Sequence, residues 1–178
     1  MRVYVMPHLD AVKSGSTYWV MLSLPVENVQ DYPRPPRLDP VAQRLAIVMG
    51  GTVVAETMQG WRVCETHHAP SYYLPAGCFA PGFLQPASGQ SFCEWKGRAG
   101  YFDLHWNGAI KWRAAWIYPA PTPGFAAIAG HIAIYAWAVD AAFVGLEQVR
   151  PQPGDFYGGW VTANLRGVIK GGAGTEGW

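Results

Sequence analysis

One short segment places a thiol and an ammonium group close together in the sequence. Cys93 and Lys96 are three residues apart in the run Cys-Glu-Trp-Lys-Gly. A nearby cation lowers the pKa of a thiol and favours the nucleophilic thiolate. In a strand these two side chains point to opposite faces, so they meet only if the chain turns around Trp95. The alternatives are that Cys93 is a buried apolar residue and that Lys96 lies at a turn on the solvated edge of a sheet.

Glu65 is the candidate acidic group of the same site. It ends a short alternating segment, and a carboxyl group with apolar neighbours can act as a general base because its pKa is raised. Alternatively, Glu65 anchors a turn or pairs with Arg62 or Arg98. The candidate catalytic residues are therefore Cys93, Glu65 and Lys96.

Two histidines follow Glu65 but do not form a recognisable metal site. His67 and His68 are adjacent, so their side chains diverge on a strand. Their spacing to Cys64 or Cys93 matches no usual zinc pattern. We expect no structural zinc, no other metal and no cofactor.

Aromatic residues recur along the candidate strands. For any single one, the core is the ordinary place, but several lining a β-cavity are typical of a pocket for a small molecule. Trp116 and Tyr118 are two positions apart and share one face of a strand, whereas only one of Tyr72 and Tyr73 can face inward. These four are the candidate ligand-binding residues.

Two glycine-containing turns predict β-hairpins. Both residues of Gly50-Gly51 can adopt positive φ, and Asn107-Gly108 favours a type I′ turn. The flanking segments are rich in β-branched and aromatic residues. The predicted hairpin strands span residues 44–49, 52–57, 99–106 and 109–118.

The remaining segments are shorter or less regular. Strands are predicted over residues 61–65, 71–75 and 141–146. The Gly-, Pro- and Ser-rich residues 76–91 are typical of a loop with at most one helical turn. Residues 126–139 fit either a helix or a strand, and we favour one helical turn followed by a strand.

These segments predict a mainly β fold, a single compact barrel- or sandwich-like domain of short antiparallel strands with at most short helical turns. The β-rich core domain is expected over residues 43–149. Residues 1–42 would form an N-terminal extension and proline-rich arm. Residues 150–178 would form a Gly-rich tail that packs on the core.

The composition describes a folded and nearly neutral chain of 178 residues. Thirteen basic and twelve acidic side chains give a formal net charge of +1, so no overall field attracts nucleic acid or an anionic membrane. Hydrophobic residues make up 50% of the chain and charged residues 14%, the opposite of a disordered composition. Three cysteines are too few for a disulfide scaffold. We therefore expect a soluble, cytoplasmic protein with no nucleic-acid or membrane partner, and its oligomeric state stays open.

Several ordered segments resemble the domain-of-unknown-function 427 family. They are Arg62-Val-Cys-Glu65, Tyr72-Tyr-Leu-Pro75, Ser91-Phe-Cys-Glu-Trp-Lys-Gly97, Ala114-Ala-Trp-Ile-Tyr-Pro119 and Ile132-Ala-Ile-Tyr135. The flanks, with Gly154-Asp-Phe-Tyr-Gly-Gly-Trp160, are similar to a longer branch of that family. The resemblance implies a compact, mostly β domain.

The resemblance implies no established chemistry, although the family carries a nucleotidyltransferase label. Metal-dependent nucleotidyl transfer needs two or three converging carboxylates. No two acidic residues of this chain are closer than three positions apart, and no Gly-x-x-x-x-Gly-Lys loop is present. The residues give that label no support.

Three functions remain open from the sequence. The leading hypothesis is a domain that binds a small polar or aromatic ligand in an aromatic-lined pocket. The first alternative is an enzyme that uses Cys93 or Glu65 in the same pocket. The second is a non-catalytic module that offers its arm and tail to a protein partner.

Overall fold

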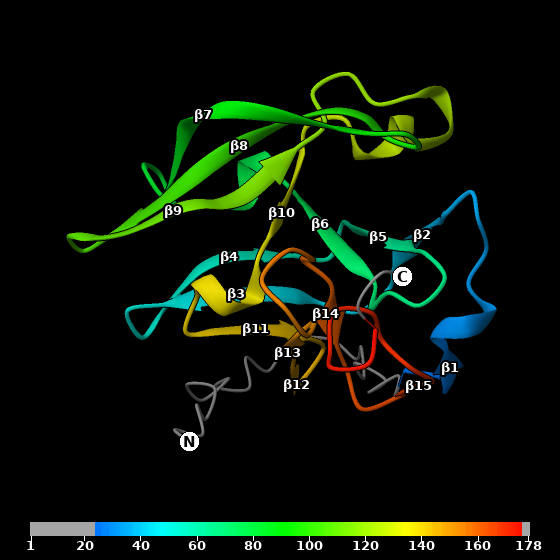
Figure 1. Cartoon of the computed structure of the whole chain (residues 1–178). Helices are drawn as coiled ribbons and strands as arrows, with labels where there is room; N and C mark the ends of the chain where they lie inside the picture. The colour runs from blue at the N-terminus through cyan, green and yellow to red at the C-terminus, as the bar shows by residue number, and fades with distance from the viewer. Residues whose placement is uncertain (1–23, 176–178) are drawn as a thin grey trace, which may run out of the picture.

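The computed structural model describes residues 24–175, and over this range the chain forms strands joined by turns and single 3-10 helices (Figure 1). All strand pairs in this range are antiparallel except one short parallel pair, Glu27–Asn28 with Leu165–Arg166. The main sheet has seven strands and curls into a half-barrel. Its strands, in spatial order, are β2 (Arg37–Val41), β5 (Gly60–Cys64), β6 (Ser71–Pro75), β10 (His131–Ile134), β9 (Ala109–Ile117), β8 (Gly97–Trp106) and β7 (Leu84–Cys93). The mainly β prediction is confirmed.

A second sheet of four strands packs against the main sheet. Its order is β12 (Glu147–Gln148), β11 (Ala141–Val144), β3 (Leu45–Met49) and β4 (Thr52–Thr57). Two small pairs complete the strands: β1 (Glu27–Asn28) with β15 (Leu165–Arg166), and β13 (Arg150–Pro151) with β14 (Trp160–Val161). The 3-10 helices are η1 (Val29–Asp31), η2 (Ala76–Cys78), η3 (Pro123–Ile128) and η4 (Ala136–Ala138).

Both predicted hairpins are present. Gly50 and Gly51 have φ of 60° and 71° and connect β3 to β4. Asn107 and Gly108 have φ of 47° and 81° and connect β8 to β9. Two successive positive φ values are the type I′ geometry that matches the twist of paired strands. The helical turn and strand predicted within residues 126–139 are also found, as the end of η3 followed by β10.

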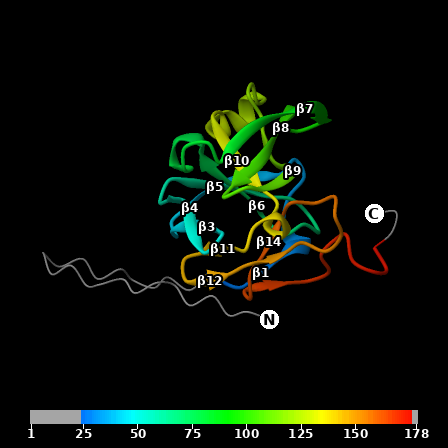
Figure 2. The same ribbon diagram turned by 90° about the vertical axis from the view of Figure 1, so that its left-hand side faces the viewer.

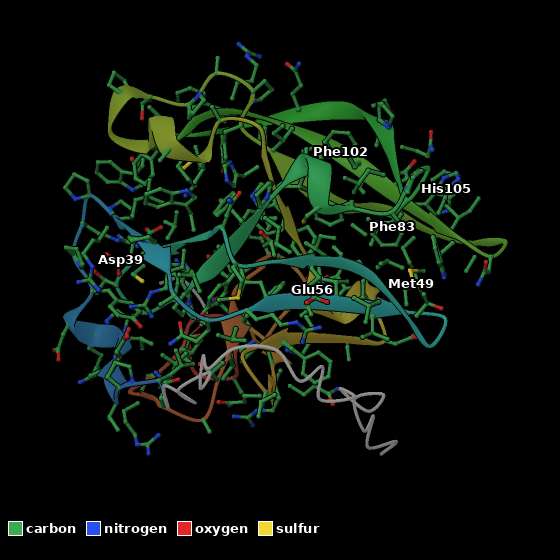
Figure 3. The ribbon with its side chains drawn as sticks, turned by 180° about the vertical axis from the view of Figure 1, so that it is seen from behind. Asp39, Met49, Glu56, Phe83, Phe102 and His105 are labelled. Carbon is green, nitrogen blue, oxygen red and sulfur yellow. The ribbon has the colours of Figure 1, made fainter. Side chains whose placement is uncertain are left out.

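The two faces of the central strands of the main sheet carry different clusters of buried side chains. In β6, Tyr72 and Leu74 point to the core between the two sheets, whereas Tyr73 points to the opposite face. We call these the inter-sheet core and the cavity face. Phe83, Phe102 and Met49 belong to the inter-sheet core, and Figure 3 shows them well separated from Asp39.

Trp160 attaches the C-terminal segment to the inter-sheet core. Its ring is 0% exposed and stacks on Tyr72 with the centroids 5.1 Å apart, and its indole nitrogen donates to the Ile134 carbonyl at 2.9 Å. The Trp160 backbone nitrogen donates to the Pro70 carbonyl. As a result β14, orange in the figures, lies beside β6 in both views (Figures 1 and 2).

The loop predicted for residues 76–91 is wrong over its second half. β7 is a ten-residue strand that pairs with β8 from Leu84 opposite Leu104 to Cys93 opposite Gly97. A strand at the edge of a sheet tolerates proline and glycine, because one side of its backbone needs no partner. A register shift between Ala87 and Gln90 accommodates the residues that disrupt the alternating pattern.

The proline-rich arm expected within residues 1–42 contributes a strand to the main sheet. β2 pairs along its whole length with β5, so this part of the proline-rich arm is the other edge strand of the main sheet. Pro40 is accommodated there for the same reason as the proline in β7. Within residues 24–175, no helix is long and apolar enough to cross a membrane.

We expect Trp160→Ala to lower the free energy of unfolding by about 3–5 kcal/mol, because a fully buried indole leaves a cavity. Trp112→Ala is the matched control: Trp112 is 68% exposed, so the same chemical change should cost less than about 1 kcal/mol. Urea denaturation of both variants measures the difference. Equal losses would contradict the anchoring role of Trp160.

Candidate functional site

A cavity of about 590 Å³ opens on the cavity face of the main sheet. We call it the aromatic cavity. Its base is built from side chains of four different strands, so the sheet register sets their relative positions. These side chains are Val63 of β5, Tyr73 of β6, Ala99 and Tyr101 of β8, and Trp116 of β9.

The turn between β7 and β8 forms one wall, and the thiol and ammonium residues singled out from the sequence both line the cavity there. Residues 94–96 connect the two strands, and both Cys93 and Lys96 line the cavity. Thr122 fastens this turn: its hydroxyl donates to the Trp95 carbonyl at 2.5 Å, and its backbone nitrogen donates to the Lys96 carbonyl at 3.2 Å. The turn around Trp95, on which the prediction depended, is therefore present.

Lys96 is a buried cation. It is only 9% exposed, and its Nζ lies 5.6 Å from the ring centre of Tyr118 and 5.8 Å from that of Phe125. Ring faces attract a cation, but they replace only part of its lost hydration. The ion pairs among residues 24–175 do not include Lys96. An anion in the cavity would supply the missing counter-charge.

Tyrosine hydroxyl groups provide neutral hydrogen-bonding positions beside this cation. The Tyr118 hydroxyl faces the Cys93 thiol, and burial together with this thiol raises the pKa of Tyr118. The Trp116 indole nitrogen donates to the Tyr73 hydroxyl at 3.3 Å. Burial raises the pKa of Tyr73 and of Tyr118 far above the usual range. Both hydroxyl groups therefore stay protonated at physiological pH.

Glu65 lies at the rim of the cavity and pairs with a residue that was not predicted. Its carboxylate is 3.1 Å from the Arg34 guanidinium. Pairing with Arg62 or Arg98 is wrong, because Arg62 contacts Glu27 and Asp39 and Arg98 donates to Gln90. Since Glu65 is paired, its charge adds little to the field inside the cavity.

His68 lines the same rim and is held as a neutral ring. Its Nδ1 lies 2.9 Å from the Thr66 carbonyl, which can only accept, so Nδ1 carries the proton. Burial lowers the pKa of His68 below its ordinary value of 6.5. The ring edge packs on Tyr157 with centroids 4.8 Å apart. Nε2 therefore bears a lone pair and can accept a hydrogen bond or a proton.

The C-terminal segment forms the opposite wall, and two glycines allow its close approach. A Cβ atom on Gly158 would lie 2.1 Å from Cη2 of Trp116, and one on Gly159 would lie 2.3 Å from Oε1 of Gln152. Gln152 is itself buried and donates to the Lys170 carbonyl at 2.9 Å. The segment packs directly against the cavity through its backbone.

The structure places six of the seven predicted site residues around the aromatic cavity. They are Glu65, Tyr73, Cys93, Lys96, Trp116 and Tyr118. Tyr72 is the exception and is a correction: it is buried in the inter-sheet core, stacked on Trp160, because adjacent strand residues face opposite sides.

Several lining residues were missed by sequence reasoning. His68 was considered only as a metal ligand, and the others lie in the arm or the tail: Arg34, Gln152, Phe156, Tyr157 and Lys170. The Gly-Asp-Phe-Tyr-Gly-Gly-Trp run at residues 154–160 was the available signal, since two glycines before a tryptophan indicate close packing. Among residues 24–175 no group of three His, Cys, Asp or Glu side chains is placed to hold a metal ion.

The fold and the cavity together define a small antiparallel β domain with an aromatic cavity on one face of its main sheet. The family model for a domain of unknown function, DUF427, matches residues 37–145, more than half of the chain, so the protein belongs to this family. No match was found among curated proteins. The family resemblance is thereby confirmed, and it brings no activity with it.

We expect Gly158→Ala to lower the free energy of unfolding by about 1–3 kcal/mol, because the added methyl group overlaps the Trp116 ring. Gly77→Ala is the control, since a Cβ at Gly77 meets nothing within 4 Å. Thermal unfolding of the two variants compares the sites. If the two substitutions cost the same, the close approach of the C-terminal segment is not as described.

His68 should make stability depend on pH. Its folded-state pKa is depressed, so between that pKa and about 6.5 the unfolded chain binds more protons and stability falls as pH decreases. One such proton contributes at most about 1.4 kcal/mol per pH unit. His68→Asn keeps a donor for the Thr66 carbonyl and removes the titration. We expect a flatter curve for the variant in urea denaturation from pH 7.5 to 5; parallel curves would exclude this contribution of His68.

Proposed function

We propose that the chain binds a small ligand that combines a planar ring with an anionic group, and that the aromatic cavity is its binding site. The observation that carries the proposal is Lys96, a buried cation at the cavity wall whose charge no carboxylate among residues 24–175 neutralises. A carboxylate or similar group on the ligand would complete that pairing.

The size and lining of the cavity support a small molecule. Its volume of about 590 Å³ falls within the roughly 300–1,000 Å³ that is usual for such sites. The rings of Tyr73, Trp116 and Tyr118 offer flat apolar surface, with a few polar groups between them. Phe92 and Phe156 are exposed and also line the cavity. The ring of an entering ligand would therefore contact these two side chains before it reaches the buried part of the cavity.

Catalysis in the same cavity is the second candidate function. The observation that favours it is the pairing of residue types at the cavity: Cys93 on one wall and the neutral His68 at the rim, with its Nε2 lone pair available. A thiol and an imidazole base are the groups that nucleophilic catalysis uses. Glu65 suits the role of base less well, because its carboxylate is paired with Arg34.

We further propose a cytoplasmic location. Cys64, Cys78 and Cys93 are all free thiols, as is usual in a reducing compartment.

A thermal-shift screen of small aromatic acids, followed by calorimetry, tests the ligand proposal. A ligand at one hundred times its Kd should add about 2.7 kcal/mol of stability. Lys96→Met should weaken an aromatic acid at least tenfold and leave its neutral amide unchanged. Lys111→Met is the matched control, because Lys111 is exposed and outside the cavity lining.

Three outcomes would change the proposal. Equal affinity of the acid for the Lys96→Met variant and the native protein would remove Lys96 from the site. If the bound ligand is converted, and Cys93→Ser stops conversion while binding persists, the protein is an enzyme. If no aromatic acid or amide binds, the proposal fails and the interaction module becomes the better hypothesis.

A further inference from the structure

A second hollow of about 300 Å³ adjoins the aromatic cavity. It is lined by Arg34, Thr66, His67 and Lys170, and none of these is acidic. Arg34 and Lys170 also line the aromatic cavity, so the two spaces share a boundary. We call the second space the mouth hollow.

Three hydrogen bonds to two other segments fix the position of His67 in the mouth hollow. Its backbone nitrogen donates to the Val29 carbonyl at 2.9 Å, and its own carbonyl accepts from the Lys170 nitrogen at 2.7 Å. Nδ1 lies 3.2 Å from the Val168 carbonyl. His67 also has a φ of 64°, a left-handed conformation that costs a non-glycine residue energy and gathers at functional sites. The hollow is thus a fixed feature in which the loop after β5 and the C-terminal segment are joined.

The charges of the mouth hollow favour an anion. Arg34 contacts Glu65 on the side of the aromatic cavity, but a guanidinium has five N–H donors and a single contact leaves others available. The Nζ of Lys170 lies 5.5 Å from the Tyr157 ring centre, and Lys170 takes part in none of the ion pairs of residues 24–175. An arginine fork and a lysine point charge together are the usual partners of a tetrahedral dianion.

We propose that the mouth hollow binds a phosphoryl or sulfuryl group, and that this group belongs to a ligand whose ring occupies the aromatic cavity. The first half of this inference stands on the mouth hollow alone, whereas the second half rests on the proposed function. Arg34 and Lys170 line both spaces, so a group bound to them lies next to the aromatic cavity as well as in the mouth hollow. One ligand could therefore occupy both spaces. The anionic phosphoryl or sulfuryl group would lie at the entrance, outside the aromatic rings.

Titration of the full chain with inorganic phosphate, followed by the backbone amide signals in nuclear magnetic resonance, tests the first half. We expect saturable shifts at Thr66, His67 and Lys170. Lys170→Met should weaken phosphate binding at least tenfold. Arg34→Met should do the same, and because Arg34 is an exposed side chain we expect the variant to fold. Lys111→Met should change nothing. Sulfate should compete with phosphate, and acetate should not.

Phenyl phosphate tests the link between the two spaces. It should bind at least tenfold more tightly than inorganic phosphate, because its phenyl ring also contacts the side chains of the aromatic cavity. If phosphate binds equally to the native protein and to both variants, the mouth hollow is not a dianion site. If phosphate binding is lost in the variants but phenyl phosphate gains no affinity, the assignment of one ligand to both spaces is overturned. The proposed function fails separately, through the Lys96→Met experiment with ligands that carry no phosphoryl group.

Discussion

Tyr72 and Tyr73 are consecutive residues of β6, and strand geometry requires them to point to opposite faces of the main sheet. Tyr72 stacks on Trp160 in the inter-sheet core, and Tyr73 receives the Trp116 indole hydrogen bond on the cavity face. Because β6 is paired on both sides, neither ring can change to the other face without a shift in the pairing of the neighbouring strands. Packing of the four-stranded sheet on one face therefore fixes where the rings on the other face lie. The aromatic cavity depends on that constraint.

A network of charged groups fixes the edge of the same sheet. Arg62 of β5 contacts Asp39 of β2 at 3.3 Å and Glu27 of β1 at 2.9 Å, and the Tyr32 hydroxyl donates to Glu27 at 2.5 Å. Burial and its hydrogen bond to Glu27 raise the pKa of Tyr32, so this hydroxyl remains a donor. Removing one member of a partly buried network leaves its partners uncompensated, so the network favours one arrangement of the edge strands. Asp39 marks its place in Figure 3.

The sequence predicted the two hairpins because their signals are local. It did not predict β7 or the face of Tyr72, because these depend on contacts between distant parts of the chain. Gly50-Gly51 and Asn107-Gly108 act through their own backbone angles, so the hairpins needed no tertiary information. β7 has no local signal, because an exposed edge strand needs no alternating pattern. Nor could the sequence decide which of Tyr72 and Tyr73 faces the cavity, since that depends on where the second sheet packs.

The aromatic cavity joins residues of two origins in the chain. Tyr73, Lys96 and Trp116 fall within the matched region, residues 37–145, whereas Arg34 and Lys170 lie outside it. On the two proposals, the matched region supplies the ring contacts and the inner cation, and the flanking segments supply the two cations at the entrance, Arg34 and Lys170. Gly158 is where the two parts of the chain meet, because only a residue without a side chain lets the C-terminal wall contact Trp116. A change at the entrance can therefore alter which ligand enters while the sheet beneath stays the same, since no strand of the main sheet takes part in the mouth hollow.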